Sequence, residues 1–67
     1  MKVGDLVCCP VDLETGEMFA DNWELAIIKF IYENEPKISV TYVNECSEGI
    51  VDGTWYTSEI ELISEAQ

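Results

Sequence analysis

Residues 23–43, WELAIIKFIYENEPKISVTYV, decide the fold of this chain. They hold two runs rich in β-branched and aromatic residues, 23–32 and 38–43, with the polar stretch ENEPK between them. Such runs favour strands, and Asn34 and Pro36 supply the chemistry of a turn. The stretch therefore predicts a long β-hairpin, which must be the spine of the fold in a chain of 67 residues.

The first arm of this hairpin changes its pattern partway along. Trp23, Leu25 and Ile27 alternate with neighbours of mixed character, so we expect Leu25 and Ile27 in the core. Bulky residues occupy both faces after Ile27, which indicates a bulge or a sharp coil where a strand turns a barrel corner. A buried helix is the competing prediction for residues 23–32, but the β-branched and aromatic residues favour a strand.

The second arm alternates more cleanly. Ile38, Val40 and Tyr42 share one face, as in an antiparallel strand with one side buried. The expected core therefore includes Leu25, Ile27, Val40, Tyr42 and Ile60. Truncating one of these residues should cost about 2–5 kcal/mol, comparable to the whole stability of so small a domain.

The rest of the chain completes an all-β fold. Five strands are predicted near residues 3–9, 23–32, 37–44, 53–57 and 60–63, with a bend at Gly4 and Asp5. A one-turn 3₁₀ helix at Ser58 and Glu59 precedes the last strand. Residues 45–54 are expected to form a loop, and residues 1–67 a single domain.

A long excursion separates the first two strands. Residues 11–22, VDLETGEMFADN, carry turn chemistry at Thr15 and Gly16, and we expect an irregular segment or a short hairpin there. Met18 and Phe19 are expected to fold back over one mouth of the core. A helix is the weaker alternative, because a glycine interrupts the segment.

Composition limits the partners. Asp and Glu number 14 against 3 Lys and Arg, so the net charge is −11, and the chain has no Arg. Direct binding of nucleic acid or of an anionic membrane is therefore not expected, while basic proteins are attracted. The chain shows no export or transmembrane signal, which predicts a cytoplasmic protein.

Little in the sequence points to catalysis or to a metal. The three cysteines, Cys8, Cys9 and Cys46, lack the spacing of a zinc site, and we interpret them as small apolar residues. The DLETGE stretch lacks the spacing of a calcium loop. No His is present and no pair of carboxylates stands out, so we expect neither enzyme activity nor a cofactor.

The two ends of the chain, KVGDLV and WYTSEIELIS, together with the central hairpin, resemble the small SH3-like barrels of the Tudor/KOW type. Short proteins of tailed bacteriophages show the same ends, with an aromatic pair before an S-x-[IL]-E-[LV]-I motif. The resemblance implies a five-stranded SH3-like barrel with a 3₁₀ turn before the last strand. It also implies a phage or mobile-element origin.

The same resemblance implies a binding site where the first long loop meets the ends of the third and fourth strands. Its aromatic members would be Phe19, Trp23, Tyr42, Trp55 and Tyr56, with Asp12, Glu14, Glu17 and Asp21 beside them. Rings and carboxylates together suit a cationic guest. The competing interpretation is that these rings fill the core. In either case the adjacent Trp55 and Tyr56 must point to opposite faces of a strand.

These features predict a small, acidic, non-enzymatic interaction module that binds a basic protein or peptide. Two alternatives remain open. The chain could be an acidic inhibitor that mimics DNA, which needs carboxylates spread over one face without an aromatic groove. It could also be a virion accessory protein that acts by forming a homo-oligomer.

Overall fold

Antiparallel strands make up most of the regular structure in the computed structural model, which describes residues 1–44 and 51–65. The elements are β1 (Leu6–Cys9), β2 (Val11–Asp12), β3 (Glu17–Met18), β4 (Glu24–Ile31), β5 (Lys37–Tyr42), β6 (Asp52–Tyr56), the 3₁₀ helix η1 (Thr57–Glu59) and β7 (Glu61–Ser64). The predicted all-β class and the 3₁₀ turn before the last strand are confirmed. The competing helix over residues 23–32 is excluded, because β4 covers that stretch.

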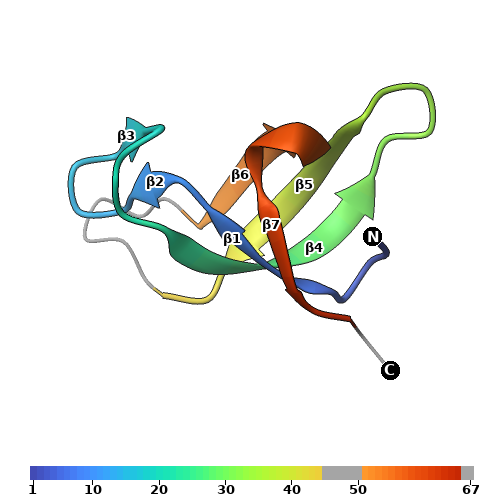
Figure 1. Ribbon diagram of the computed structural model, residues 1–67, viewed down its shortest axis with the longest axis horizontal. Coiled ribbons are helices and arrows are strands. Elements are labelled where there is room, and N and C mark those ends of the chain that lie inside the picture. The colour runs from blue at the N-terminus through green and yellow to red at the C-terminus, as the bar shows by residue number, and fades with distance from the viewer. Residues whose placement is uncertain (45–50, 66–67) are drawn as a thin grey trace.

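One large sheet organises the molecule. Its five strands follow the order β6-β5-β4-β1-β7, and β2 and β3 form a separate two-stranded sheet. The central strand β4 pairs with β1 on one side and β5 on the other, and the sheet coils so that β1 and β7 cross over β4 and β5 (Figure 1). Strands β6 and β7 are the two edges of this sheet, and the pairings within it are antiparallel.

The first strand begins later than predicted, at Leu6. Gly4 has a φ of 96°, a left-handed value that favours glycine and interrupts an extended chain. The Lys2 N–H donates to the Asp5 carboxylate over 2.8 Å, and the Asp5 N–H donates to the Lys2 carbonyl over 3.1 Å. The predicted bend at Gly4 and Asp5 is thus a hydrogen-bonded turn.

The core occupies one face of the large sheet. It consists of Val7, Cys9, Val11, Leu13, Ala26, Ile28, Ile38, Val40, Tyr42, Trp55 and Ile60. Val40, Tyr42 and Ile60 are buried as predicted, but Leu25 and Ile27 are 37% and 45% exposed. The prediction that these two residues belong to the core is wrong, because Ala26 and Ile28 point inward from β4 instead.

Two large rings account for this orientation of β4. The buried Trp55 indole N–H donates to the Tyr42 hydroxyl over 3.0 Å, so both rings lie inside the molecule. Ala26 is the cross-strand neighbour of Tyr42, where a small side chain leaves room for the ring. Gly53 is small for the same reason, since a Cβ at that position would collide with the Tyr42 hydroxyl.

The predicted irregularity in β4 is confirmed. The pairing of β4 with β5 shifts between Ile28 and Phe30, so Lys29 is the additional residue of a β-bulge. Beyond the bulge Ile31 packs against the core, and Phe30 turns outward. The bulky residues on both faces of β4 after Ile27 are therefore explained by this shift in its pairing with β5.

A short polar motif closes the end of β6. The Tyr56 N–H, at the end of that edge strand, donates to the Glu59 carboxylate over 2.9 Å. Helix η1 then turns the chain into β7, which pairs with β1. The connection predicted at Ser58 and Glu59 thus begins one residue earlier, at Thr57.

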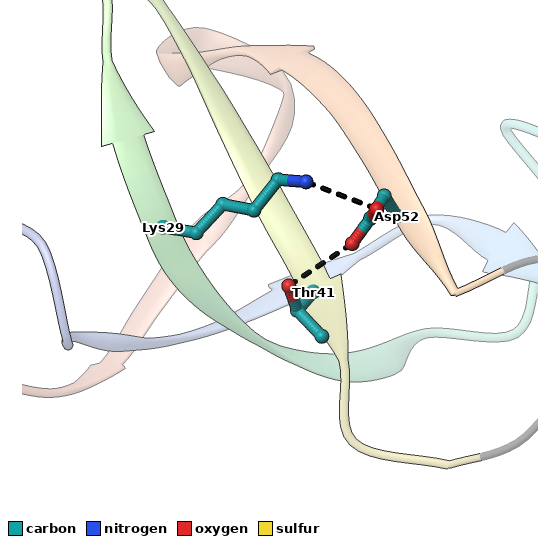
Figure 2. A network of polar contacts seen from close by, with 3 residues as sticks. All are labelled: Lys29, Thr41 and Asp52. Atoms are coloured by element: carbon teal, nitrogen blue, oxygen red, sulfur yellow. Dashed lines mark hydrogen bonds and ion pairs between the residues drawn. The ribbon is translucent and has the colours of Figure 1, made fainter.

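A polar network crosses the outward side of the sheet (Figure 2). Lys29, from the bulge in β4, reaches over β5 to Asp52 on β6, with 3.0 Å between Nζ and Oδ2. The Thr41 hydroxyl on β5 donates to the other carboxylate oxygen over 3.0 Å. Bonding to Lys29 first, and to Thr41 second, lowers the pKa of Asp52 below its ordinary value.

Replacing Ile28 with Ala should lower the free energy of unfolding by about 2–5 kcal/mol, because it leaves a cavity in the core. The matched variant Ile27→Ala should cost less than half as much, since that side chain is already 45% exposed. Urea denaturation at low micromolar protein compares the two. Equal losses, or a larger loss for Ile27→Ala, would contradict the observed orientation of β4.

Asp52→Asn should destabilise the protein at neutral pH, and this deficit should vanish as the medium becomes acidic. A carboxyl whose folded pKa is lowered stabilises the fold above its unfolded pKa, about 3.9, and loses that contribution as pH falls through the folded pKa. Urea denaturation at neutral pH and near pH 3 measures the difference. In a Lys29→Met background the effect of Asp52→Asn should shrink, and a deficit that grows in acid would contradict the direction of the shift.

Candidate functional site

Residues 11–22 form a small projection, the acidic lobe, at the end of the sheet remote from the N-terminus (Figure 1). Its two strands, β2 and β3, pair so that Val11 faces Met18 and Asp12 faces Glu17. This is the short hairpin allowed for by the turn chemistry of the stretch. The lobe is a structured element of the fold rather than an irregular loop.

Local hydrogen bonds hold the turn of the lobe. The Asp12 carboxylate accepts the Glu14 N–H over 2.9 Å, and the Asp12 carbonyl accepts the Gly16 N–H over 2.7 Å. Gly16 has a φ of 75°, which suits glycine at this point of the turn. Val11 and Leu13 are buried in the main core and anchor the lobe to the rest of the domain.

Carboxylates dominate the surface of the lobe. Three of them, Glu14, Glu17 and Asp21, are exposed, and Asp12 is half-buried. Asp12 and Glu17 lie directly opposite each other across β2 and β3, an arrangement in which like charges destabilise a sheet. In the described part of the chain both ion pairs involve other carboxylates, those of Asp52 and Glu35. The negative charge of the lobe is therefore not neutralised by any described lysine.

Two apolar side chains project from the same lobe. Met18 is about half exposed, and Phe19 is 64% exposed. The prediction that both residues cover the mouth of the core is therefore wrong for Met18. Phe19 does contact the core, because its ring and that of Trp55 form a T-shaped pair with 5.5 Å between centroids and 86° between planes.

The backbone of Phe19 is in an unusual conformation. Its φ is 61°, in the left-handed region, which is a genuine outlier for a bulky residue. Such a conformation costs on the order of 1–3 kcal/mol and persists only where the surroundings impose it. Strain of this kind clusters at binding sites, and here it presents an aromatic ring among carboxylates.

The nine residues predicted for the binding site fall into three places. The lobe brings together Asp12, Glu14, Glu17, Phe19 and Asp21. Tyr42 and Trp55 are buried in the core, so the prediction that they line an exposed site is corrected. Trp23 and Tyr56 lie on the opposite, outward side of the large sheet. Trp55 and Tyr56 do point to opposite faces, as expected of neighbours on a strand.

Sequence reasoning missed the apolar character of that outward side. Leu25 and Ile27 are exposed there, in line with Trp23, and Phe30 follows beyond the bulge. The strict alternation of Trp23, Leu25 and Ile27 did indicate a shared face. Nothing in the alternation says which face is buried when the intervening residues, Ala26 and Ile28, are also apolar.

The two cysteines of β1 have opposite orientations, as neighbours on a strand do. Cys9 is buried and Cys8 is partly exposed. Burial, and then the neighbouring Cys8 thiol, raise the pKa of Cys9 to about 12. Burial, and then Glu61, also raise the pKa of Cys8. Both are therefore thiols rather than thiolates at neutral pH, which makes them poor nucleophiles. Cys46 lies outside the described residues.

The described residues, 1–44 and 51–65, contain no pocket and no group of at least three His, Cys, Asp or Glu side chains placed to hold a metal ion. No helix in this part of the chain is long and apolar enough to cross a membrane. Comparisons of the chain with protein-family models, curated proteins and solved structures found no match.

Proposed function

We propose that this protein is a small, acidic, non-enzymatic interaction module that binds a basic protein or peptide through its acidic lobe. The observation that carries the proposal is the pair Asp12 and Glu17, which face each other across two strands without a described lysine to neutralise them. A cation from a partner would relieve this repulsion. The strained, exposed ring of Phe19 lies on the same lobe.

Electrostatics supports a basic partner. A net charge of −11 attracts positively charged surfaces over long distances and repels nucleic acid. Long-range attraction of this kind raises the association rate more than it raises the affinity. The carboxylates of the lobe would orient the basic surface of the partner as it approaches.

Specificity in the proposal comes from the apolar side chains. Aromatic residues that fill a pocket on a partner typically contribute a large share of binding energy. Phe19 and Met18 extend from the lobe among carboxylates, so a partner with a small apolar pocket bordered by Lys or Arg would fit both features. This mixture favours a protein partner over the DNA-mimic alternative, which needs carboxylates without exposed rings.

An SH3-like barrel is part of the proposal. The strand order, the bulged central strand β4 and the 3₁₀ helix before β7 support it. The resemblance of the chain ends to phage-encoded proteins supports a cytoplasmic module from a phage or mobile element. Its partner would then be a basic protein of the host or of the phage itself.

Neutralising the lobe should slow association. The isosteric triple variant Asp12→Asn, Glu14→Gln, Glu17→Gln keeps the turn, because an Asn side chain can still accept the Glu14 N–H. The partner is captured from host lysate on the immobilised protein, and its kinetics are then measured by surface plasmon resonance. We expect an association rate about tenfold lower, and a steep decrease with salt in the wild type.

The control carries the same loss of charge at a distance from the lobe. This control variant changes three exposed carboxylates and should slow association distinctly less; its substitutions are Glu33→Gln, Glu61→Gln and Glu65→Gln. An equal loss in both variants would mean that only net charge matters. Association that does not change from low to high salt, or tight binding to duplex DNA, would contradict the proposed function.

Phe19→Gly separates binding from folding. Glycine adopts the left-handed backbone without strain, which offsets the lost ring contact with Trp55, worth about 0.5–1.5 kcal/mol. The free energy of unfolding should therefore stay within about 1 kcal/mol of the wild type. The dissociation rate of the captured partner should rise about tenfold. An unchanged dissociation rate would remove Phe19 from the binding surface.

A further inference from the structure

The solvent side of the large sheet, here called the outer face, is apolar over three adjacent strands. Four side chains from β4 and the residue before it point outward and are exposed: those of Trp23, Leu25, Ile27 and Phe30. On β1, Leu6 is the cross-strand neighbour of Ile27 and Cys8 that of Leu25.

The third strand continues this surface. Just after β5, the Val43 N–H donates to the Leu25 carbonyl, which places the exposed Val43 beside Leu25. Cross-strand neighbours are in side-chain contact range, so these residues make one continuous surface. A contiguous apolar surface of this kind indicates an interaction site, whereas apolar residues exposed singly do not.

The charges of the outer face are balanced, unlike those of the whole protein. Lys29 and Lys37, two of the three lysines in the sequence, come from β4 and β5 on this side. Lys29 pairs with Asp52 over 3.0 Å, and Lys37 pairs with Glu35 over 3.3 Å. The Lys37 ammonium also lies 5.1 Å from the centre of the Tyr32 ring and 5.8 Å from that of Tyr56.

This balance leaves little net charge on the outer face. Glu61, on β7 opposite Cys8, is the one further carboxylate among the outward-facing residues that the structure describes on these five strands. Among the described residues the negative excess therefore lies elsewhere, with four of the carboxylates in the acidic lobe.

We propose that the outer face packs against the outer face of a second copy of this chain, sheet on sheet, in a symmetric dimer. A basic partner would be drawn to unpaired carboxylates, and the outer face offers few. The outer face of a second copy is likewise apolar and almost neutral. A two-fold axis would bring the same surface of both copies into contact. Face-to-face packing of two sheets is a common arrangement for such surfaces.

The chain has enough surface for this assembly. A stable protein interface buries roughly 800 Å² on each partner, less than a fifth of the 4405 Å² surface of this chain. The acidic lobes would lie away from the contact, and their repulsion is screened beyond roughly 10 Å at 0.1 M salt. Dimer formation should therefore strengthen with salt, whereas binding of a basic partner should weaken.

Analytical ultracentrifugation of the full chain tests the proposal, from low micromolar to millimolar protein and at about 0.02, 0.15 and 0.5 M NaCl, a range that spans strong and weak screening. We expect the mass to rise with concentration to twice the monomer mass. The dissociation constant should fall as salt increases. Ile27→Ser, at the centre of the face, should raise the dissociation constant at least tenfold with an unchanged circular dichroism spectrum.

Met18→Ser is the matched control, because it removes a similar exposed side chain from the acidic lobe instead. It should leave the dimer intact. Three results would overturn the proposal: a monomer under every condition, a dimer lost in Met18→Ser and retained in Ile27→Ser, or a dimer that weakens as salt increases. If Ile27→Ser instead abolishes binding of the captured basic partner, the outer face belongs to that partner and the dimer is rejected. Failure of the lobe variants to slow that partner would count against the proposed function alone.

Discussion

The hydrogen bond from the Trp55 indole N–H to the Tyr42 hydroxyl is the constraint on which the rest of the structure depends. It joins two large rings from adjacent strands inside a core that 67 residues can only just enclose. The positions beside the rings must therefore be small, and they are Gly53 and Ala26. Once Ala26 faces inward, alternation along β4 sends Leu25 and Ile27 to the solvent.

The positions of the strands could be predicted from the sequence, because each is bounded by turn chemistry and rich in β-branched or aromatic residues. The bulge was also predictable, since a regular strand with one buried face does not carry bulk on both faces after Ile27. The orientation of β4 could not be predicted. Its alternation offers two apolar faces, and the choice depends on rings contributed by two later strands, β5 and β6.

The candidate site was predictable only where it is contiguous in sequence. Asp12, Glu14, Glu17 and Phe19 belong to one hairpin, so their proximity follows from the chain itself. The aromatic members from distant strands were not predictable, because Tyr42 and Trp55 could face either way until the core was known. The left-handed backbone of Phe19 has no sequence signal at all, since it occurs at a residue type that normally avoids it.

The molecule separates its charge from its apolar surface. The acidic lobe concentrates carboxylates on one small hairpin, whereas Lys29 and Lys37 both form ion pairs beside the outer face. The outer face is nearly neutral only because these two lysines offset its carboxylates, so its neutrality depends on two side chains. The composition alone, with its large negative charge, conceals this division.

The carboxylate of Glu59 has a consequence for how copies of this chain can meet. An edge strand with free N–H groups is a template for further strands, and unchecked strand addition leads to fibres. Glu59 already occupies the N–H of Tyr56 at the end of β6, so a strand extending along that end would have to displace a charged acceptor. Such a blocked edge favours closed assemblies in which the side chains of two sheet faces pack together. It disfavours open-ended polymers that grow by backbone hydrogen bonds between strands.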